Sequence, residues 1–369
     1  NWNNRLIVLT GARGVGKTTM LLQHINRTFD DTSKALYVSA DHIWFANHSL
    51  IDLAEYHYTH GGTHLFIDEI HKYKNWQQEI KNIYDSFPRL NLIVTGSSML
   101  RIEHALGDLS RRCKVYTLLG LSFREYLKLE NVADWAILSL DEILQNHIHI
   151  SAVLTGKVKV LGHFERYLRH GYYPFYKEEG NGFEERLQRI INTVLNEDIP
   201  AVVNVEYETI YKLKYLLAIL SEQAPYTLNV SALARTLETS TGQVMKLFDL
   251  LNQASIIRRL FSKEHSMKML QKPEKILFDN TNIMYALSAE ADKGTLRETF
   301  FVDMMSFNHS VSMPQRGDVL VDKHLLFEVG GRTKGYKQIA NIPDSYVVAD
   351  GVDIGFENKI PLWLFGMMY

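Results

Sequence analysis

The chain has 369 residues, of which 46% are hydrophobic and 22% are charged. These values are close to those of globular proteins and exclude a disordered or fibrous chain, and the length predicts two or three domains. The 40 Lys and Arg against 42 Asp and Glu give a net charge of −2. This balance excludes a protein coated in basic surface for nucleic acid, although it leaves a local basic patch open.

A single cysteine, Cys113, excludes a disulfide framework within the chain and a multi-cysteine zinc site. No apolar run in the sequence approaches the roughly 20 residues that a membrane-spanning helix needs. We therefore expect a cytoplasmic protein that has no membrane partner. The chain begins at Asn1 and not at a methionine, so we also expect residues upstream of it.

The first 120 residues alternate short apolar strand patterns with helical stretches. This alternation predicts a doubly wound α/β domain around a parallel sheet that is buried on both faces. The predicted strands are Arg5–Leu9, Ala35–Ser39, Leu65–Ile67, Leu90–Val94 and Cys113–Leu118.

A glycine-rich segment between the first strand and the first helix fits the phosphate-binding pattern G-x-x-x-x-G-K-[ST] at every fixed position. Its glycines let backbone N–H groups curl around phosphate oxygens, and the helix N-terminus favours negative charge. We expect Lys17 to reach the β- and γ-phosphates and the Thr18 hydroxyl to bind Mg²⁺. The predicted nucleotide-binding residues are Gly11, Ala12, Arg13, Gly14, Val15, Gly16, Lys17, Thr18 and Thr19.

Two carboxylates, Asp68 and Glu69, follow the apolar strand Leu65–Ile67. Beside a P-loop, this pattern predicts that Asp68 holds Mg²⁺ through water and that Glu69 polarises the attacking water as a general base. The alternative is a strand end that meets solvent. His71 follows closely and is a weaker candidate for a contact with the site.

Polar residues after the strand Leu90–Val94 are candidates to sense the γ-phosphate, with Ser97 as first choice and Thr95 as second. Arg111 and Arg112 precede the last strand of the domain. A guanidinium at this point can complete the nucleotide site of a neighbouring subunit as an arginine finger. The alternative is a cation pair that is favoured at a helix C-terminus.

From residue 121 to about residue 260 the patterns are mainly helical, and Ser122 with Glu125 forms a predicted capping box at the first of these helices. The helical patterns 229–237 and 240–251, followed by a strand pattern at 256–261, have helix-turn-helix spacing. Between residues 205 and 264, seven Lys and Arg stand against six Asp and Glu. This near balance favours packing against protein over autonomous DNA binding, which is left open.

Several later motifs together resemble a group of prokaryotic AAA+-like ATPases, and the resemblance spans nearly the whole chain. It implies a P-loop core at 1–120, a helical lid at 121–197, a winged-helix-like domain at 198–272 and a degenerate domain similar to restriction endonucleases at 273–369. The motifs that carry it lie at residues 92–98, 109–112, 121–127, 167–174, 278–279, 316–318 and 327–331.

The resemblance also implies roles for single residues. Arg112, rather than Arg111, falls on the family's arginine finger. Pro174 falls on the family's lid turn near the adenine, although Tyr172 stands where the family has a glycine in that turn. The endonuclease-like carboxylates correspond to Glu298, Asp318 and Glu328. The lysine of that motif is replaced by Gly330, and no sequence feature selects Lys323, Arg332 or Lys334 as its substitute.

The sequence thus predicts an Mg²⁺-dependent ATPase that couples ATP binding and hydrolysis to the binding or remodelling of a partner. A homo-oligomer and a protein partner for the C-terminal half are the expected assemblies. Three alternatives remain: a slow nucleotide-dependent switch, an ATP-gated nuclease and a DNA-binding regulator. The missing motif lysine argues against the nuclease, and the charge balance argues against the regulator.

Overall fold

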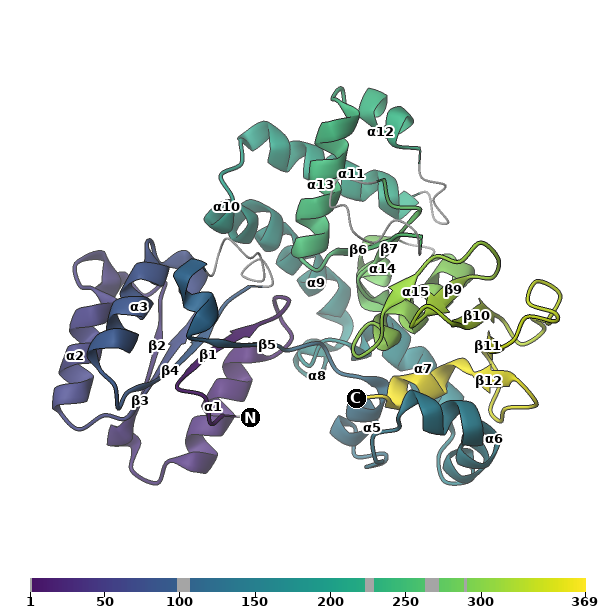
Figure 1. Cartoon of the computed structure of the whole chain (residues 1–369), viewed down its shortest axis with the longest axis horizontal. Helices are drawn as coiled ribbons and strands as arrows, with labels where there is room; N and C mark the ends of the chain where they lie inside the picture. The colour runs from purple at the N-terminus through teal and green to yellow at the C-terminus, as the bar shows by residue number, and fades with distance from the viewer. Residues whose placement is uncertain (1, 98–106, 223–228, 263–271, 289–290) are drawn as a thin grey trace. The chain divides into compact units, whose positions relative to one another are not determined.

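The computed structural model describes residues 2–97, 107–222, 229–262, 272–288 and 291–369 (Figure 1). These residues form two compact units, each of which is described by itself. The first, which we call the P-loop unit, comprises residues 1–120, 190–210 and 253–255. The second unit comprises residues 121–189, 211–252 and 256–369.

A parallel sheet of five strands forms the centre of the P-loop unit, with the strand order β2-β3-β4-β1-β5. The predicted strands are confirmed, and none of their ends is displaced by more than one residue. The strands are β1 (Leu6–Thr10), β2 (Ala35–Ser39), β3 (His64–Asp68), β4 (Asn91–Thr95) and β5 (Lys114–Thr117).

The register of the sheet brings the ends of several strands to one edge. Strand β1 is paired with β4 on one side and with β5 on the other, and β3 lies between β2 and β4. The carboxyl ends of β1, β3 and β4 therefore meet at the same edge, which is where ligands bind in open α/β sheets.

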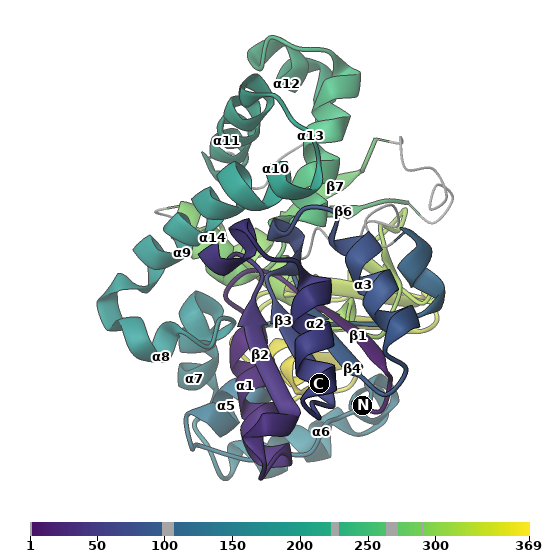
Figure 2. The same ribbon diagram turned by 90° about the vertical axis from the view of Figure 1, so that its left-hand side faces the viewer.

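Helices cover both faces of this sheet (Figures 1 and 2). Leu21 of α1 (Lys17–Thr28) packs on one face, and α2 (Leu50–Thr59) and α3 (Trp76–Ser86) contribute to the apolar cluster on the other. Apolar residues on both faces of the strands are buried, as expected for a sheet between two helix layers. Short 3-10 helices connect these elements: η1 (Thr32–Lys34), η2 (Ile43–Ala46), η3 (Ile70–Lys72) and η5 (Gly107–Arg111).

A distant stretch of the chain, residues 190–210, also belongs to the P-loop unit, and we call it the return segment. It contains the end of α9 (Phe183–Thr193), the π-helix η8 (Val194–Asp198), α10 (Ile199–Val202) and the start of α11 (Tyr207–Glu222). Val202 packs against the apolar cluster under α2 and α3. The P-loop unit is therefore discontinuous in sequence.

The second unit begins with helices. Its first helix, α5 (Phe123–Leu129), has the predicted capping box, in which the Ser122 hydroxyl accepts from the Glu125 amide and the Glu125 carboxylate accepts from the Ser122 amide. The helices that follow are α6 (Leu140–Thr155), α7 (Val160–Arg166), the π-helix η6 (Tyr167–Gly171), α8 (Tyr176–Glu179) and η7 (Gly180–Gly182).

Two further helices are present where helix-turn-helix spacing was predicted. They are α12 (Val230–Thr236) and α13 (Thr241–Gln253). Strand β6 (Ile257–Leu260) follows and pairs antiparallel with β7 (Lys275–Phe278). The two helices and the strand after them are confirmed as elements.

A mixed sheet with the order β12-β11-β10-β9-β8 completes the second unit. Helix α15 packs on its central strand β10 through Phe301 and Phe327, whose ring centroids are 5.0 Å apart. The sheet and its helices are β8 (Val311–Ser312), β9 (Val319–Val321), β10 (Leu325–Gly330), β11 (Ser345–Ala349), β12 (Lys359–Pro361), α14 (Thr281–Leu287), α15 (Lys293–Met305) and η10 (Leu362–Met367).

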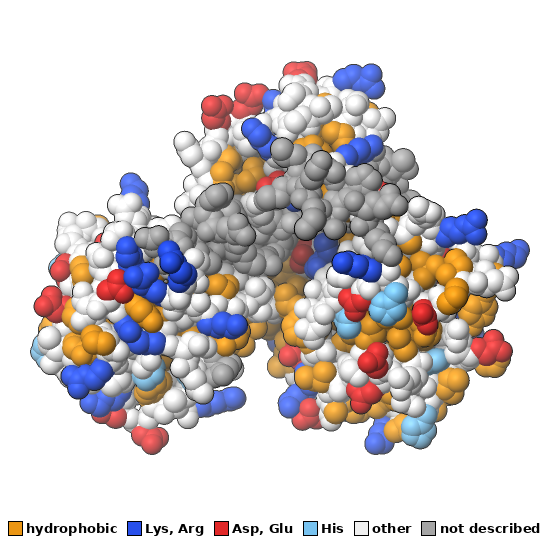
Figure 3. All heavy atoms as spheres, viewed as in Figure 1, with side chains coloured by type: hydrophobic (Ala, Val, Ile, Leu, Met, Phe, Trp, Pro, Cys, Tyr) orange, Lys and Arg blue, Asp and Glu red, His pale blue; other side chains and the backbone are white. Residues whose placement is uncertain are grey.

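The surface is mixed in charge. Figure 3 shows Lys, Arg, Asp and Glu side chains interspersed over the face that it presents. Among the described residues, no helix combines the length and apolar character that crossing a membrane requires.

Candidate nucleotide-binding site

The predicted phosphate loop lies between β1 and α1, at the edge of the sheet where the strands end. Gly14 and Gly16 have φ values of 91° and 100°, a left-handed conformation that glycine adopts without steric cost. A Cβ atom at Gly11 would collide with the backbone carbonyl oxygen of Leu118, which follows β5. The motif glycines are therefore required by the backbone path of the loop.

Lys17, the first residue of α1, is enclosed by this loop and only 6% exposed. Its amine donates to the carbonyl oxygens of Gly11 and Ala12 at 2.9 and 3.0 Å. Burial lowers the pKa of Lys17, while the carboxylates of Glu69 and Asp68 oppose this effect. The Lys17 amine is thus bonded to neutral carbonyl oxygens within the loop. Charged phosphate oxygens at this place would form stronger hydrogen bonds with it.

Asp68 is the last residue of β3, and several hydroxyl groups converge on its buried carboxylate. Thr18 Oγ1 donates to Asp68 Oδ2 at 2.5 Å, and the Tyr37 hydroxyl donates to the same oxygen at 3.0 Å. Thr95 Oγ1 donates to Asp68 Oδ1. The Thr18 hydroxyl and the Asp68 carboxylate offer hard oxygen ligands of the kind that Mg²⁺ prefers. They belong to the two residues that the sequence predicts to hold Mg²⁺.

Tyr37 is a contact of the site that the sequence analysis missed. Residues of β2 and β3 are in register, so Tyr37 pairs with Phe66 and lies on the same face as Asp68 two residues later. Burial and the nearby Asp68 charge raise the pKa of Tyr37, so the phenol stays protonated and donates to Asp68.

Glu69 follows Asp68 directly and has the left-handed φ of 53°, which is uncommon for a residue other than glycine. Its backbone N–H donates to Asp68 Oδ1 at 3.1 Å and to Thr95 Oγ1 at 3.3 Å. Backbone conformations of this kind are concentrated at functional sites. The turn directs the Glu69 carboxylate toward His71 and Arg13 at 3.6 and 4.0 Å.

The two candidate γ-phosphate sensors make different contacts. Thr95, the second choice, ends β4 and contacts both Asp68 and the Glu69 amide through its hydroxyl. Ser97, the first choice, is buried, and its backbone N–H donates to His71 Nδ1 at 3.4 Å. Thr95 is therefore bonded to the carboxylate pair and Ser97 to His71, and the role of either residue as a sensor stays a prediction.

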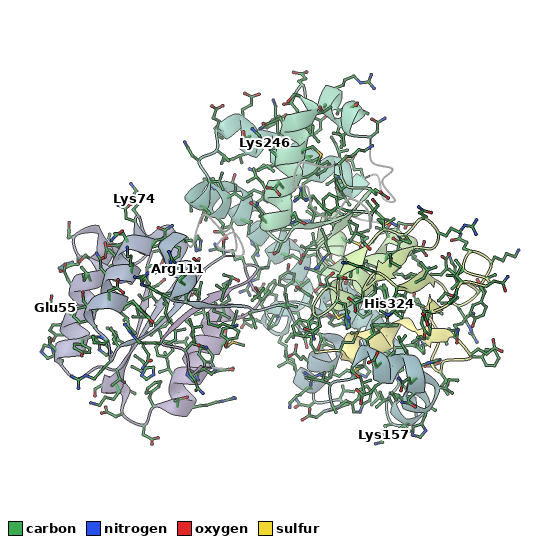
Figure 4. All side chains as sticks on the ribbon, in the orientation of Figure 1. Glu55, Lys74, Arg111, Lys157, Lys246 and His324 are labelled. Carbon is green, nitrogen blue, oxygen red and sulfur yellow. The ribbon has the colours of Figure 1, made fainter. Side chains whose placement is uncertain are left out.

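Arg112 lies at the opposite edge of the sheet from the phosphate loop. Lys114 pairs with Ile7, near the start of β1, whereas the loop follows Thr10 at the end of β1. The Arg112 guanidinium donates to Asp85 of α3 at 3.1 and 3.2 Å. The preceding residue, Arg111, ends η5 and is labelled in Figure 4. The Arg112 side chain is therefore not brought to the phosphate loop of its own chain.

Pro174 belongs to the second unit, beyond the π-helix η6. The turn before it is fixed by Asn282 of α14, whose side-chain oxygen accepts from the Tyr172 amide at 2.9 Å. The Asn282 amide nitrogen donates to the carbonyl of Leu168, also at 2.9 Å. The place of Pro174 near an adenine stays a prediction.

Asp198, at the end of the return segment's π-helix, is a second site residue that the sequence analysis missed. Its Oδ1 accepts from Arg13 Nη1 of the phosphate loop at 2.8 Å and lies 3.6 Å from His71 Nε2. His71, the weaker candidate, lies 3.6 Å from both Glu69 and Asp198, and its contact with a nucleotide site stays a prediction. No local motif marks Asp198, since it is 185 positions from Arg13 in sequence.

The endonuclease-like carboxylates of the second unit are paired with lysines. Lys334 Nζ lies 2.5 Å from Glu328 Oε1 and 3.8 Å from Asp318 Oδ2, and Lys275 pairs with Glu298. A Cβ at Gly330 would overlap the Lys334 stem at 2.6–2.8 Å, so the glycine makes room for this lysine. Within the described parts of the chain, no group of three His, Cys, Asp or Glu is arranged to hold a metal ion.

We expect Lys334→Met to lower the free energy of unfolding by about 3 kcal/mol, because it leaves the fully buried Glu328 carboxylate without its cation. Burial already raises the pKa of Glu328, and Asp318 adds to this effect. Urea unfolding followed by circular dichroism measures the change. The matched control is Lys337→Met, at an exposed neighbouring lysine, which should keep the wild-type free energy of unfolding. If Lys334→Met were as stable as this control, the ion pair between Lys334 and Glu328 would not stabilise the fold.

Comparisons with known proteins agree with the architecture of the P-loop unit. Residues 3–127 match the family model described as an AAA domain, and residues 161–293 match a domain of unknown function. The uncharacterized protein MJ1637 of Methanocaldococcus jannaschii is 27% identical over 398 residues, which covers 98% of this chain and 82% of that protein. MJ1544 of the same organism is 31% identical over 133 residues, covering 35% of this chain and 29% of that protein.

Two solved structures are more distant. The Aeropyrum pernix ORC1 protein in complex with DNA has a TM-score of 0.33 and 14% identity, over 76% of this chain and 86% of that one. AMPPCP-bound DnaA from Aquifex aeolicus has a TM-score of 0.25 and 17% identity, over 68% and 82%. Similarities this low carry no argument about function. The start of this chain is therefore similar to the AAA domain model over residues 3–127, and it has the parallel sheet and phosphate loop of a P-loop fold.

Proposed function

We propose that this chain is an Mg²⁺-dependent ATPase that couples its nucleotide state to the binding or remodelling of a partner. The observation that carries the proposal is the pairing of the Thr18 hydroxyl with the Asp68 carboxylate at 2.5 Å beside a loop that encloses Lys17. Glu69 follows directly and adds a carboxylate that can accept a proton from water.

Binding is assigned to residues of the phosphate loop and the first turn of α1. The backbone N–H groups of residues 11–16 and the Lys17 amine hold the β- and γ-phosphates, and Thr19 extends the contact along α1. Thr18 and, through water, Asp68 would hold Mg²⁺, which neutralises phosphate charge when bound. Pro174 is assigned to the adenine.

Hydrolysis is assigned to the carboxylate that follows Asp68. Glu69 accepts a proton from the attacking water as that water bonds to the γ-phosphorus and the bond from the γ-phosphorus to the β–γ bridging oxygen breaks, so that ADP leaves. Ser97 senses the γ-phosphate. Thr95 supports this arrangement, since its hydroxyl joins the Asp68 carboxylate to the Glu69 backbone amide. Arg112 is assigned to the site of a neighbouring subunit, which agrees with its position at the far edge of its own sheet.

The remaining parts are assigned to coupling. The helical lid is assigned to residues 121–197, a winged-helix-like domain to residues 198–272 and a degenerate endonuclease-like domain to residues 273–369, with the return segment 190–210 of the first two packed into the P-loop unit. The last domain is assigned a structural or partner-binding role, in which Lys275 and Lys334 are paired with the carboxylates of Glu298 and Glu328.

Protein is favoured over DNA as the partner of the winged-helix-like part. Arg258 is engaged by Asp279 and Asp303 at 3.1 and 3.0 Å, and Arg259 by Asp249 at 2.6 Å. These guanidinium groups are therefore committed to ion pairs within the unit. Lys246, which is labelled on α13 in Figure 4, is exposed, but one cation supplies little phosphate affinity.

We expect ATP and Mg²⁺ to convert the Glu69→Gln protein into a ring-sized species in light scattering, because slow hydrolysis preserves the ATP-bound interface that Arg112 completes. Arg112→Ala should retain ATP binding and lose most of the turnover of the assembled protein. The matched control is Arg111→Ala, one position away.

A monomer under every nucleotide condition would contradict this assembly. Arg112 would then have no neighbouring site, and the slow nucleotide-dependent switch would be favoured over a remodelling machine. Turnover measured with and without a captured partner separates those two activities.

A further inference from the structure

A cluster of charged and polar side chains, in which His71 and Asp198 are buried and Arg13 is partly exposed, surrounds the candidate base Glu69. Its central member is Asp198, which is 1% exposed and reaches the site from the return segment. Asp198 Oδ1 lies 2.8 Å from Arg13 Nη1, within hydrogen-bond distance, and 3.6 Å from His71 Nε2. A π-helix, an element often found at functional sites, ends at this residue.

The imidazole of His71 lies between the two carboxylates. Its side chain has no exposed surface, and its Nδ1 accepts from the Ser97 backbone N–H at 3.4 Å. A ring that accepts at Nδ1 carries its proton on Nε2. That Nε2–H faces Glu69 Oε2 and Asp198 Oδ1, both at 3.6 Å. The imidazole therefore spans the base and the aspartate.

The guanidinium of Arg13 has two carboxylates within reach and is bonded to one of them. It lies 2.8 Å from Asp198 and 4.0 Å from Glu69. A partly buried cation is stabilised by the nearest carboxylate. If Asp198 were neutral and small, Glu69 would be the remaining partner, and a guanidinium bonded to Glu69 would occupy the oxygen that has to accept a proton.

We propose that Asp198 is a positioning residue for ATP hydrolysis, which holds Arg13 away from Glu69 and lies against His71 beside it. This inference rests on the proposed function, because it assigns a task to a residue around the same base. It places control of the reaction in the return segment, although the phosphate loop, the carboxylate pair, the sensor candidates and the arginine finger all lie within residues 11–112.

The test is a double-mutant cycle on the full chain with Asp198→Ala, Arg13→Ala and the combined variant. Asp198→Ala should lower kcat on the order of 10²-fold, as expected for a misplaced reacting group, and change the dissociation constant of a fluorescent ATP analogue by less than about threefold. The combined variant lacks the guanidinium that Asp198→Ala releases, so its kcat should be about tenfold higher than that of Asp198→Ala alone. A purely structural role of Asp198 would not produce this recovery.

Two further variants make the cycle decisive. Glu197→Gln, at an exposed neighbouring carboxylate 3.8 Å from Lys72, should leave kcat unchanged. Asp198→Asn keeps an oxygen acceptor and similar volume, so it carries the test if the alanine variant does not fold, and it should lose about tenfold in kcat. Circular dichroism and thermal unfolding check the fold of each variant.

The outcomes separate this inference from the function on which it rests. Wild-type turnover that both Asp198 variants retain overturns the role of Asp198 alone, as does a combined variant whose loss equals the product of the single losses. A wild-type chain that binds ATP but does not hydrolyse it overturns the inference together with the hydrolytic step. A wild-type chain that does not bind ATP overturns the proposed function itself.

Discussion

Lys17→Ala should abolish tight ATP binding, with a loss of affinity of at least about 10²-fold. The amine is enclosed by the phosphate loop and bonded to the Gly11 and Ala12 carbonyls, so its removal takes away the cation closest to the predicted phosphates. A hydrogen bond to a charged group contributes about 1.5–3 kcal/mol, which is roughly 10- to 100-fold per bond. Isothermal titration calorimetry with ATP and Mg²⁺ measures the loss.

Lys34→Ala is the matched control for this variant. Lys34 also donates to a glycine carbonyl, that of Gly61 at 3.1 Å, but it is exposed and precedes β2 at the start of the strand. Its replacement should leave ATP affinity unchanged. Affinity that Lys17→Ala retains would show that the loop is not the phosphate site.

Glu69→Gln should leave ATP binding intact and lower the turnover number by about 10²-fold or more, the usual contribution of a general base. The amide has the size of the carboxylate but cannot accept the proton of the attacking water. Phosphate release under saturating ATP gives the turnover number, and calorimetry on the same protein gives the affinity. The large expected effect on kcat with little effect on binding distinguishes this residue from Lys17.

Glu55→Gln, an exposed position on α2 that is labelled in Figure 4, is a suitable control for the loss of one carboxylate. It should hydrolyse ATP at the wild-type rate. Turnover that is unchanged in Glu69→Gln would remove Glu69 from the role of base and leave the neighbouring Asp68 or Asp198 to be examined for it.

Features that depend on neighbouring residues could be predicted from the sequence. The strands of the first domain end within one residue of their predicted positions, because short apolar runs bounded by turns define buried parallel strands well. The capping box of Ser122 and Glu125 depends on a spacing of three residues and is present as predicted. The phosphate loop is likewise contained in one continuous motif.

Features that depend on the pairing of distant segments could not be predicted. Tyr37 reaches Asp68 only because β2 and β3 pair in one particular register, and the sequence does not specify that register. Asp198 is contributed by a π-helix that follows a long helical region, where an aspartate has no distinguishing pattern. The sequence also ranked Ser97 above Thr95, although the Thr95 hydroxyl makes the contact with Asp68.

The position of Lys334 is a feature that the sequence predicted only in part. Lys334 was one of three candidates to replace the motif lysine at Gly330, and the sequence offered no means to select it. The selection comes from packing, because the absence of a side chain at Gly330 gives the Lys334 stem a path to Glu328. The conformation of the loop that carries Lys334 cannot be predicted from the spacing of residues in the sequence.

The discontinuity of the P-loop unit has a consequence for how the protein is made. A ribosome delivers the whole phosphate motif and the carboxylate pair Asp68 and Glu69 long before the return segment, since Asp198 follows Arg13 by 185 positions. The nascent sheet can therefore acquire its nucleotide loop early, while the buried partner of Arg13 is still to be synthesised. During that interval the chain carries an ATP-binding motif without the aspartate that completes its surroundings, so a fragment ending at residue 120 resembles a biosynthetic intermediate more than a finished domain.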